Sequence, residues 1–121
     1  MGNQNWFEIL KDIILTSISN VKEDSIIYEN VNYEAFNIYF ETERKLYCMQ
    51  IELNSGINVH LLYHQGYLKN GNKNYVVDPI MTKSTLNTIK KIKRKTLFNW
   101  DLRMKKIILY LCECINDTAN D

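Results

Sequence analysis

The chain has 121 residues, of which 45% are hydrophobic and 24% are charged, and its formal net charge is +1. This length suits one domain, and the balance of apolar and charged residues excludes the composition of a disordered protein. We therefore expect residues 1–121 to form a single folded domain.

The first segment has apolar residues at three- and four-residue intervals, among them Trp6, Leu10 and Ile14. This spacing predicts an amphipathic helix from Asn3 to about Ser19. Three charged residues interrupt the segment, so it lacks the uncharged run of a signal sequence or a membrane span. We expect a cytoplasmic protein without membrane contact.

From Ser25 onward the apolar period is two, and the turn residues fix how the strands pair. Asn54-Ser55-Gly56 predicts a three-residue hairpin loop with Gly56 in the left-handed conformation. Glu43-Arg44 predicts a second turn. The two turns agree on one face, and together they place seven apolar side chains on it: Phe36, Ile38, Phe40, Met49, Ile51, Val59 and Leu61.

Two further strands extend this sheet. Asn70-Gly71 is a strong signal for a two-residue hairpin turn that leads into a strand over residues 72–77, with a bulge at Gly66. A strand over Ser25–Glu29 precedes the others. The pattern therefore predicts an antiparallel meander of about five strands.

Two helices complete the chain. Pro79 ends the last strand, and Thr82 or Ser84 caps a helix to about Lys95 whose Leu86, Ile89 and Ile92 face the sheet. The longest helix begins at Trp100, whose side chain we expect in the core, and a polar tail starts at Asn116. The predicted fold class is α+β, with an N-terminal helix, the meander sheet, and two C-terminal helices packed on the sheet.

The cysteines and histidines do not form a recognisable reaction centre. Cys48, Cys112 and Cys114 are an odd number, and residues two apart on a helix point in nearly opposite directions, so we expect reduced thiols. His60 and His64 lie about 13 Å apart along one strand, too far to share an ion. We expect no metal and no cofactor, and assign no catalytic residue.

Residues 41–45 loosely resemble the motif of a metal-dependent nuclease. They fall in a predicted turn, however, where a run of charged side chains is usually explained by exposure to solvent. An enzyme with an unrecognised site, using His60, His64 or Glu52, remains the third hypothesis for this chain.

Charge is distributed unevenly along the chain. Residues 1–78 contain six basic and ten acidic residues, whereas residues 79–121 contain nine and four. All nine C-terminal basic residues lie between Lys83 and Lys106. They are either a solvated helix face or a surface that binds nucleic acid or an acidic protein. The candidate binding residues of this basic face are Lys83, Lys90, Lys91, Arg94, Arg103 and Lys106.

The second candidate surface is the sheet face opposite the predicted core. Its mixture of aromatic, amide and aliphatic side chains resembles a protein interface. Either a helix covers this face, or a second copy or a foreign partner binds it. The candidate residues are Tyr39, Gln50, His60, Leu62 and His64.

Our first hypothesis is a small binding protein that acts by macromolecular contact, such as an inhibitor of the immunity or anti-defence type. The frequent use of Asn, Ile, Lys and Tyr fits an AT-rich coding sequence and so a phage or mobile-element source. The second hypothesis, from another class, is nucleic-acid binding through residues 83–106. A protein is the first-choice partner, and a homodimer is the alternative assembly.

Overall fold

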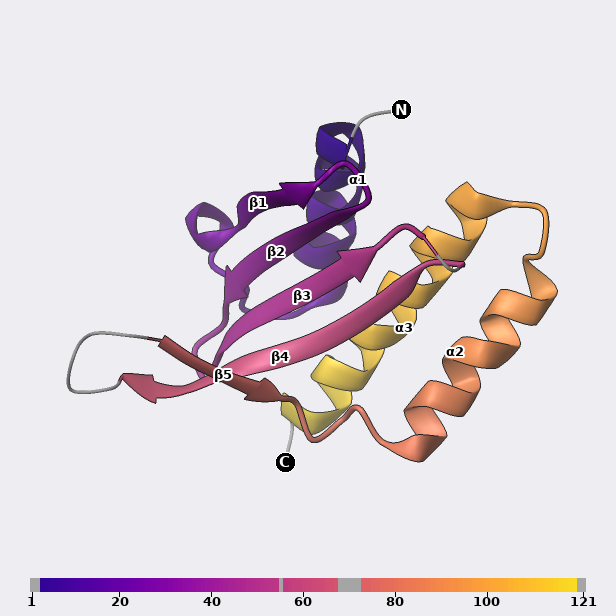
Figure 1. Cartoon of the computed structure of the whole chain (residues 1–121). Helices are drawn as coiled ribbons and strands as arrows, with labels where there is room; N and C mark the ends of the chain where they lie inside the picture. The colour runs from indigo at the N-terminus through magenta and orange to yellow at the C-terminus, as the bar shows by residue number, and fades with distance from the viewer. Residues whose placement is uncertain (1–2, 55, 68–72, 120–121) are drawn as a thin grey trace.

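A computed structural model of the whole chain describes residues 3–54, 56–67 and 73–119 (Figure 1). Within these ranges the chain forms three α-helices, a short 3-10 helix (η1) and five strands. Their bounds are α1 Asn3–Ser17, η1 Glu23–Ser25, β1 Ile27–Asn32, β2 Ala35–Glu41, β3 Leu46–Glu52, β4 Asn58–Tyr67, β5 Lys73–Val77, α2 Lys83–Lys95 and α3 Trp100–Ala119.

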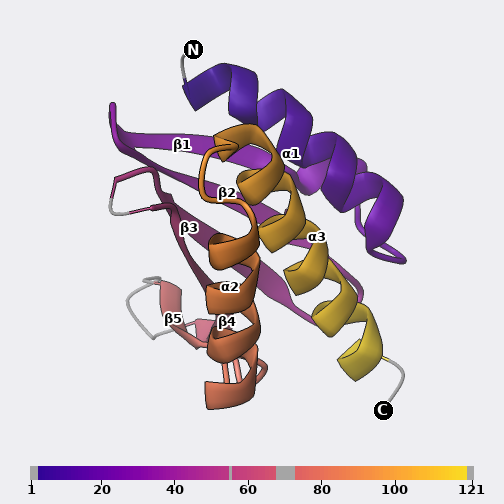
Figure 2. The same ribbon diagram turned by 90° about the vertical axis from the view of Figure 1, so that its right-hand side faces the viewer.

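The five strands form one antiparallel sheet in the order β1-β2-β3-β4-β5, which confirms the predicted meander. The helices α1 and α3 pack against each other behind the sheet, and α2 runs beside α3 (Figures 1 and 2). No described helix covers the opposite face of the sheet. The fold is α+β as predicted.

The core lies between the sheet and the helices. All seven side chains that the sequence places on one sheet face are buried there, so the predicted register is confirmed. The register pairs Phe36 with Ile51, and Met49 with both Ile38 and Leu61. Alternating polarity and two turns were sufficient to set this register because a one-residue slip would expose every core side chain.

Two described residues of the turn between β3 and β4 adopt the left-handed conformation. Gly56 has φ +84°, as predicted, and the next residue, Ile57, has φ +66°. A β-branched residue is strained at positive φ. Ile57 is almost fully buried, so the hydrophobic gain of packing its side chain offsets this strain.

The ends of several elements differ from the sequence predictions. β1 runs over Ile27–Asn32 and not Ser25–Glu29, because Ser25 ends the 3-10 helix. The β4–β5 pairing shifts register between His64 and Tyr67, where the bulge was predicted. The predicted Asn70-Gly71 turn lies outside the described residues.

Three predictions about the helices were wrong. Leu86 is exposed and Thr85 is buried in its place, next to the cap at which the Thr85 N–H donates to Thr82 Oγ1 (3.1 Å). Trp100 is half-exposed. Asn116 does not begin a frayed tail, because α3 continues to Ala119.

The reason that α3 continues is a long-range tie at Asn116. Its Oδ1 accepts from the Ser19 N–H (3.1 Å), and its Nδ2 donates to the Ser17 carbonyl. One side chain of α3 therefore satisfies backbone groups at the C-terminal end of α1, where helices leave carbonyls unpaired.

Candidate functional site

The sheet face turned away from α1 and α3, which we call the open face, carries a row of side chains that crosses all five strands. The register pairs Ile27 with Tyr39, Tyr39 with Cys48, Cys48 with Leu62, and Leu62 with Val77. All five members are apolar or aromatic. Ile27 and Val77, on the two edge strands, are 57% and 64% exposed.

The open face is strongly curled. β2 and β5 are separated by two strands, so their backbones would lie about 14 Å apart in a flat sheet. The rings of Tyr39 on β2 and Tyr75 on β5 nevertheless have centroids only 5.9 Å apart, and Tyr75 contacts the His64 ring at 5.5 Å. Strand twist therefore brings side chains from opposite halves of the sheet together.

One consequence of the curl is that Cys48, although it lies on the open face, is buried. Burial raises the pKa of the Cys48 thiol to about 11. A thiol of this kind is protonated at neutral pH, whereas the nucleophilic form is the thiolate.

Hydrogen bonds hold the Tyr39 ring in place. Glu29 Oε1 accepts from Tyr39 Oη and from Asn37 Nδ2, each at 2.8 Å. These bonds, that of Asn37 first, lower the pKa of Glu29, whereas burial raises the pKa of Tyr39. A hollow of about 500 Å³ lies beside this group and is lined by Ser25, Ile27, Glu29, Tyr39, Glu41, Leu46 and Tyr75.

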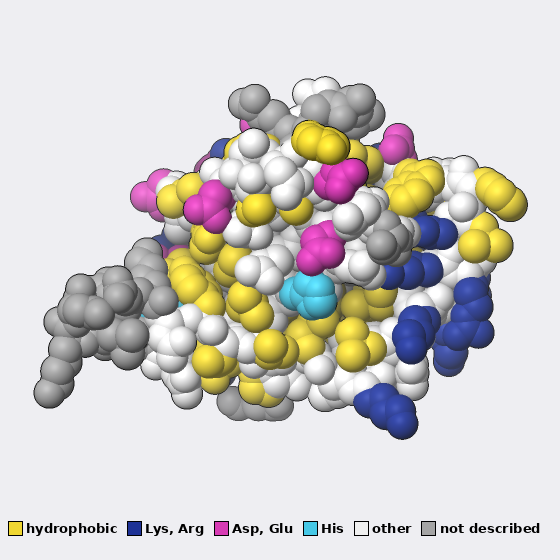
Figure 3. Space-filling model, in the orientation of Figure 1, with side chains coloured by type: hydrophobic (Ala, Val, Ile, Leu, Met, Phe, Trp, Pro, Cys, Tyr) yellow, Lys and Arg dark blue, Asp and Glu magenta, His cyan; other side chains and the backbone are white. Residues whose placement is uncertain are grey.

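The structure brings all five predicted sheet-face residues to the open face, part of which faces the viewer in Figure 3. His60 is exposed, and its Nε2 lies 4.0 Å from Glu52 Oε1. The other four predicted residues are partly buried: Tyr39, Gln50, Leu62 and His64. In the described parts of the chain, no three His, Cys, Asp or Glu side chains are grouped so that they could hold a metal ion.

Sequence reasoning missed Ile27, Tyr75 and Val77 as members of this surface. The alternation of side chains in the edge strands would have indicated them once the strands were paired, because Ile27 then lies opposite Tyr39 and Val77 lies opposite Leu62 on the same face. The Asn70-Gly71 turn predicted that the strand of Tyr75 and Val77 pairs with its neighbour, but no register was predicted for that pair or for the strand of Ile27.

The structure exposes most, but not all, residues of the second predicted surface. Five of its six residues are exposed on α2 and α3: Lys83, Lys90, Lys91, Arg94 and Lys106. Arg103 is buried, so its place on the basic face was wrong.

Arg103 is a structural residue. Its Nη2 donates to the carbonyls of Lys93 (2.9 Å) and Thr96 (3.3 Å), and its Nη1 donates to the Gly56 carbonyl (3.2 Å). The Lys93 and Thr96 carbonyls lie at the C-terminal end of α2, where the helix dipole is negative. The buried cation is thus balanced by oriented carbonyls.

Next to Arg103, the turn between α2 and α3 exposes an apolar group that the sequence reading did not single out. Phe98 is 98% exposed, and a hollow of about 400 Å³ beside it is lined in part by Arg94 and Lys95. We call this group the apolar corner and define it as Leu97, Phe98, Trp100 and Leu102.

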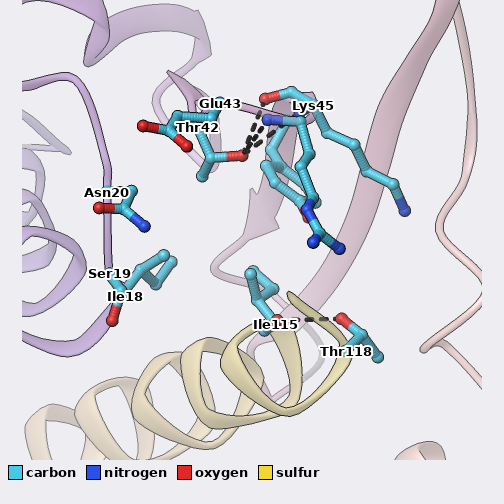
Figure 4. A pocket seen from close by; sticks show the side chains of 10 residues that line it. Ile18, Ser19, Asn20, Thr42, Glu43, Lys45, Ile115 and Thr118 are labelled. Carbon is cyan, nitrogen blue, oxygen red and sulfur yellow. Dashed lines mark hydrogen bonds between the residues drawn. The ribbon is translucent and has the colours of Figure 1, made fainter. Parts of the chain in front are cut away.

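A smaller cavity of about 200 Å³ lies where the end of α1, the β2–β3 turn and the last turns of α3 meet (Figure 4). Thr42 Oγ1 accepts from the Lys45 N–H (3.3 Å) and orders the turn. The Lys45 side chain leads away from the cavity and pairs with the buried Asp78 (3.5 Å). The polar contacts of Thr42 and Lys45 therefore stabilise the fold.

The described helices include none with both the length and the apolar character needed to cross a bilayer. No protein-family model, curated protein or solved structure matches this chain.

Proposed function

We propose that this protein works by non-covalent contact with a protein partner, which binds to the open face. The observation that carries this proposal is the apolar row from Ile27 to Val77, whose two edge members are exposed and whose inner members Tyr39 and Leu62 are partly exposed. Apolar side chains that water can reach along one sheet face suit contact with a partner. Burying them against a partner is favourable by about 25 cal/mol for each Å² removed from water.

The composition of the open face suits a protein partner. Aromatic side chains lie at its centre, where interfaces have their strongest contacts, and polar residues such as Glu29, Gln50 and His60 surround them. Tyr39 is already held by Glu29 and by the Tyr75 ring, so little rotamer freedom would be lost on binding. Such a surface acts by covering or positioning its partner, as an inhibitor of the immunity or anti-defence type does.

Affinity capture from the native host tests the proposal. The wild-type protein should retain a stoichiometric protein partner, and the double variant Ile27→Glu/Val77→Glu should not. Both positions are exposed, so neither substitution places a charge in the core. Tyr33→Glu is the matched control, because Tyr33 is 85% exposed in the β1–β2 turn and is not part of the apolar row.

Two results would count against a foreign protein partner. One is the same set of captured proteins with the wild type and the double variant. The other is a homodimer, measured by light scattering, that the double variant abolishes, because the occupant of the open face would then be a second copy.

A second candidate function, nucleic-acid binding, is favoured by the exposed cations of α2. Lys90, Lys91 and Arg94 could neutralise phosphates, and affinity would then fall steeply with added salt. Reversing these three charges should abolish such binding. Salt-independent or absent binding to duplex DNA and to RNA would remove this candidate.

A further inference from the structure

The apolar corner is unusual because it occupies a turn. The Asn99 N–H donates to the Thr96 carbonyl (3.1 Å), which closes a four-residue turn with Leu97 and Phe98 at its two central positions. Such positions ordinarily hold Gly, Pro, Asn, Asp or Ser, whose conformations suit turns and whose side chains suit water. Here Leu97 is 61% and Phe98 98% exposed, so two large apolar side chains project into solvent.

The corner is held rigidly. Asn99 Oδ1 accepts from the Leu102 N–H (3.1 Å) and so caps α3. The Arg103 guanidinium lies 5.3 Å from the centre of the Trp100 ring and bonds to the Thr96 carbonyl at the start of the turn. The exposed side chains are therefore presented by an ordered backbone, which reduces the entropy lost on binding.

Positive charge lies beside the corner. Figure 3 shows Lys and Arg side chains gathered at the end of the molecule where α2 and α3 meet, close to projecting hydrophobic side chains. Asp101 is the one acidic residue between positions 83 and 106, and it lies in the first turn of α3. We call the exposed cations of this region the basic collar and define it as Lys90, Lys91, Arg94, Lys95, Lys105 and Lys106.

We propose that the apolar corner and the basic collar dock on the surface of a membrane that contains anionic phospholipids, a peripheral contact that departs from the sequence-based expectation of no membrane contact. The corner side chains would enter the boundary between headgroups and acyl chains, and the collar would lie over the headgroups. Stable peripheral attachment takes two signals, and an apolar group beside a polybasic patch supplies both. Trp is enriched at membrane interfaces, and Trp, Phe and Leu are the side chains that interfacial helices bury there.

A nucleic acid or a protein as the partner would explain fewer features of the apolar corner and the basic collar. A nucleic acid would use the collar and could stack on Trp100, but it offers nothing to Leu97 or Leu102. Protein interfaces are depleted in Lys, and five of the six collar cations are lysines. A projecting corner also needs a complementary pocket on a protein, whereas a bilayer deforms around it. Charge and shape together favour the lipid surface.

This docking does not depend on the open face, because the α2–α3 turn lies at one end of the molecule beyond the sheet (Figure 1). The two proposals can therefore fail separately.

The test is cosedimentation of the full chain with vesicles of phosphatidylcholine, with and without phosphatidylserine. Binding should require phosphatidylserine and weaken with salt. Phe98→Ser should lower the affinity roughly tenfold or more, because a whole aromatic side chain no longer leaves water. Each of Lys91→Glu and Arg94→Glu should lower it about fivefold or more.

Matched controls separate docking from folding. Tyr33→Ser removes another highly exposed aromatic side chain, at the β1–β2 turn, and Lys11→Glu reverses a cation on α1; both variants should bind as the wild type does. Tryptophan fluorescence gives a second readout. Trp6 is buried and Trp100 is half-exposed, so a blue shift on vesicle addition would report Trp100 entering an apolar environment.

Three results would overturn the proposal. The first is equal sedimentation with both vesicle types, or none with either. The second is vesicle binding that Phe98→Ser leaves unchanged. The third is binding of DNA, RNA or a purified acidic protein that depends on the collar while vesicles containing phosphatidylserine are ignored.

Discussion

The Arg103 guanidinium donates a hydrogen bond to the Gly56 carbonyl, 47 residues earlier in the chain, at an Nη1–O distance of 3.2 Å. The same guanidinium bonds to the Lys93 and Thr96 carbonyls. Arg103 therefore joins the β3–β4 turn, the end of α2 and the start of α3. This connection holds the apolar corner in a fixed position relative to the sheet.

Replacing Arg103 should destabilise the fold strongly. Arg103→Ala would leave three carbonyls with one fewer donor and would create a cavity, so we expect the free energy of unfolding to fall by about 3 kcal/mol. Urea denaturation measures this loss. Arg94→Ala, which removes an exposed arginine from α2, is the control and should change stability by less than about 0.5 kcal/mol. Similar stability of the two variants would contradict the structural role of Arg103.

Gly56 should not tolerate a side chain. A Cβ at this position would lie 3.2 Å from Arg103 Nη1, and φ is +84°. Gly56→Ala should therefore cost about 1–2 kcal/mol in backbone strain, plus the displacement of Arg103. In an Arg103→Ala background the displacement disappears, so the cost measured by urea denaturation should be smaller. An equal cost in both backgrounds would mean that the guanidinium does not restrict this position.

Asn116→Ala should loosen the end of α1. The substitution removes the partners of the Ser17 carbonyl and the Ser19 N–H. We expect a loss of about 1–2 kcal/mol in the free energy of unfolding. Hydrogen exchange should quicken at residues 17–19 more than at the sheet. Unchanged exchange at these amides would show that α1 ends in the same way without this tie.

Stability should fall at alkaline pH because the buried thiols resist ionisation. Burial raises the pKa of Cys48 from 9.0 to about 11 and that of Cys112 from 9.0 to about 12. The folded state thus holds these protons more tightly than the unfolded chain does. The stabilisation is fully present below about pH 9, and it is lost progressively as the pH rises through about 11 to 12.

A Cys112→Ala variant tests this assignment. The variant is expected to be less stable at neutral pH because of the cavity that it leaves, but its urea midpoint should decline less steeply above about pH 9. Parallel declines in the wild type and the variant would show that Cys112 does not contribute. Tyr47, whose pKa is raised by burial and by Asp78 to about 12, contributes to the remaining decline in both proteins.

The sheet could be predicted from the sequence because turn residues and the alternation of apolar residues within each strand are enough to define it. The left-handed Gly56 and the turn at Glu43-Arg44 set the register, and the period of two then assigned Met49 and Ile51 to the core. The same rules placed Tyr39 and Leu62 on the opposite face.

What the sequence did not reveal depends on contacts between distant segments. Nothing near Arg103 indicates that it meets Gly56, so an arginine on an amphipathic helix was assigned to the solvent. Cys48 is buried because the sheet curls until Tyr75 meets Tyr39, and alternation of polar and apolar residues contains no information about curl. Trp100 was assigned to the core by its helical spacing, but it covers Arg103 at the surface.

Site-specific photo-crosslinking in the native host tests the central claim most directly. A photoreactive phenylalanine analogue at Ile27 or at Val77, on the two edges of the open face, should join the chain to one discrete protein of the host. The same analogue at Asp12, an exposed position on α1, should yield no such product. A discrete product at Asp12 with none at either edge position would contradict the assignment of the open face as the contact surface.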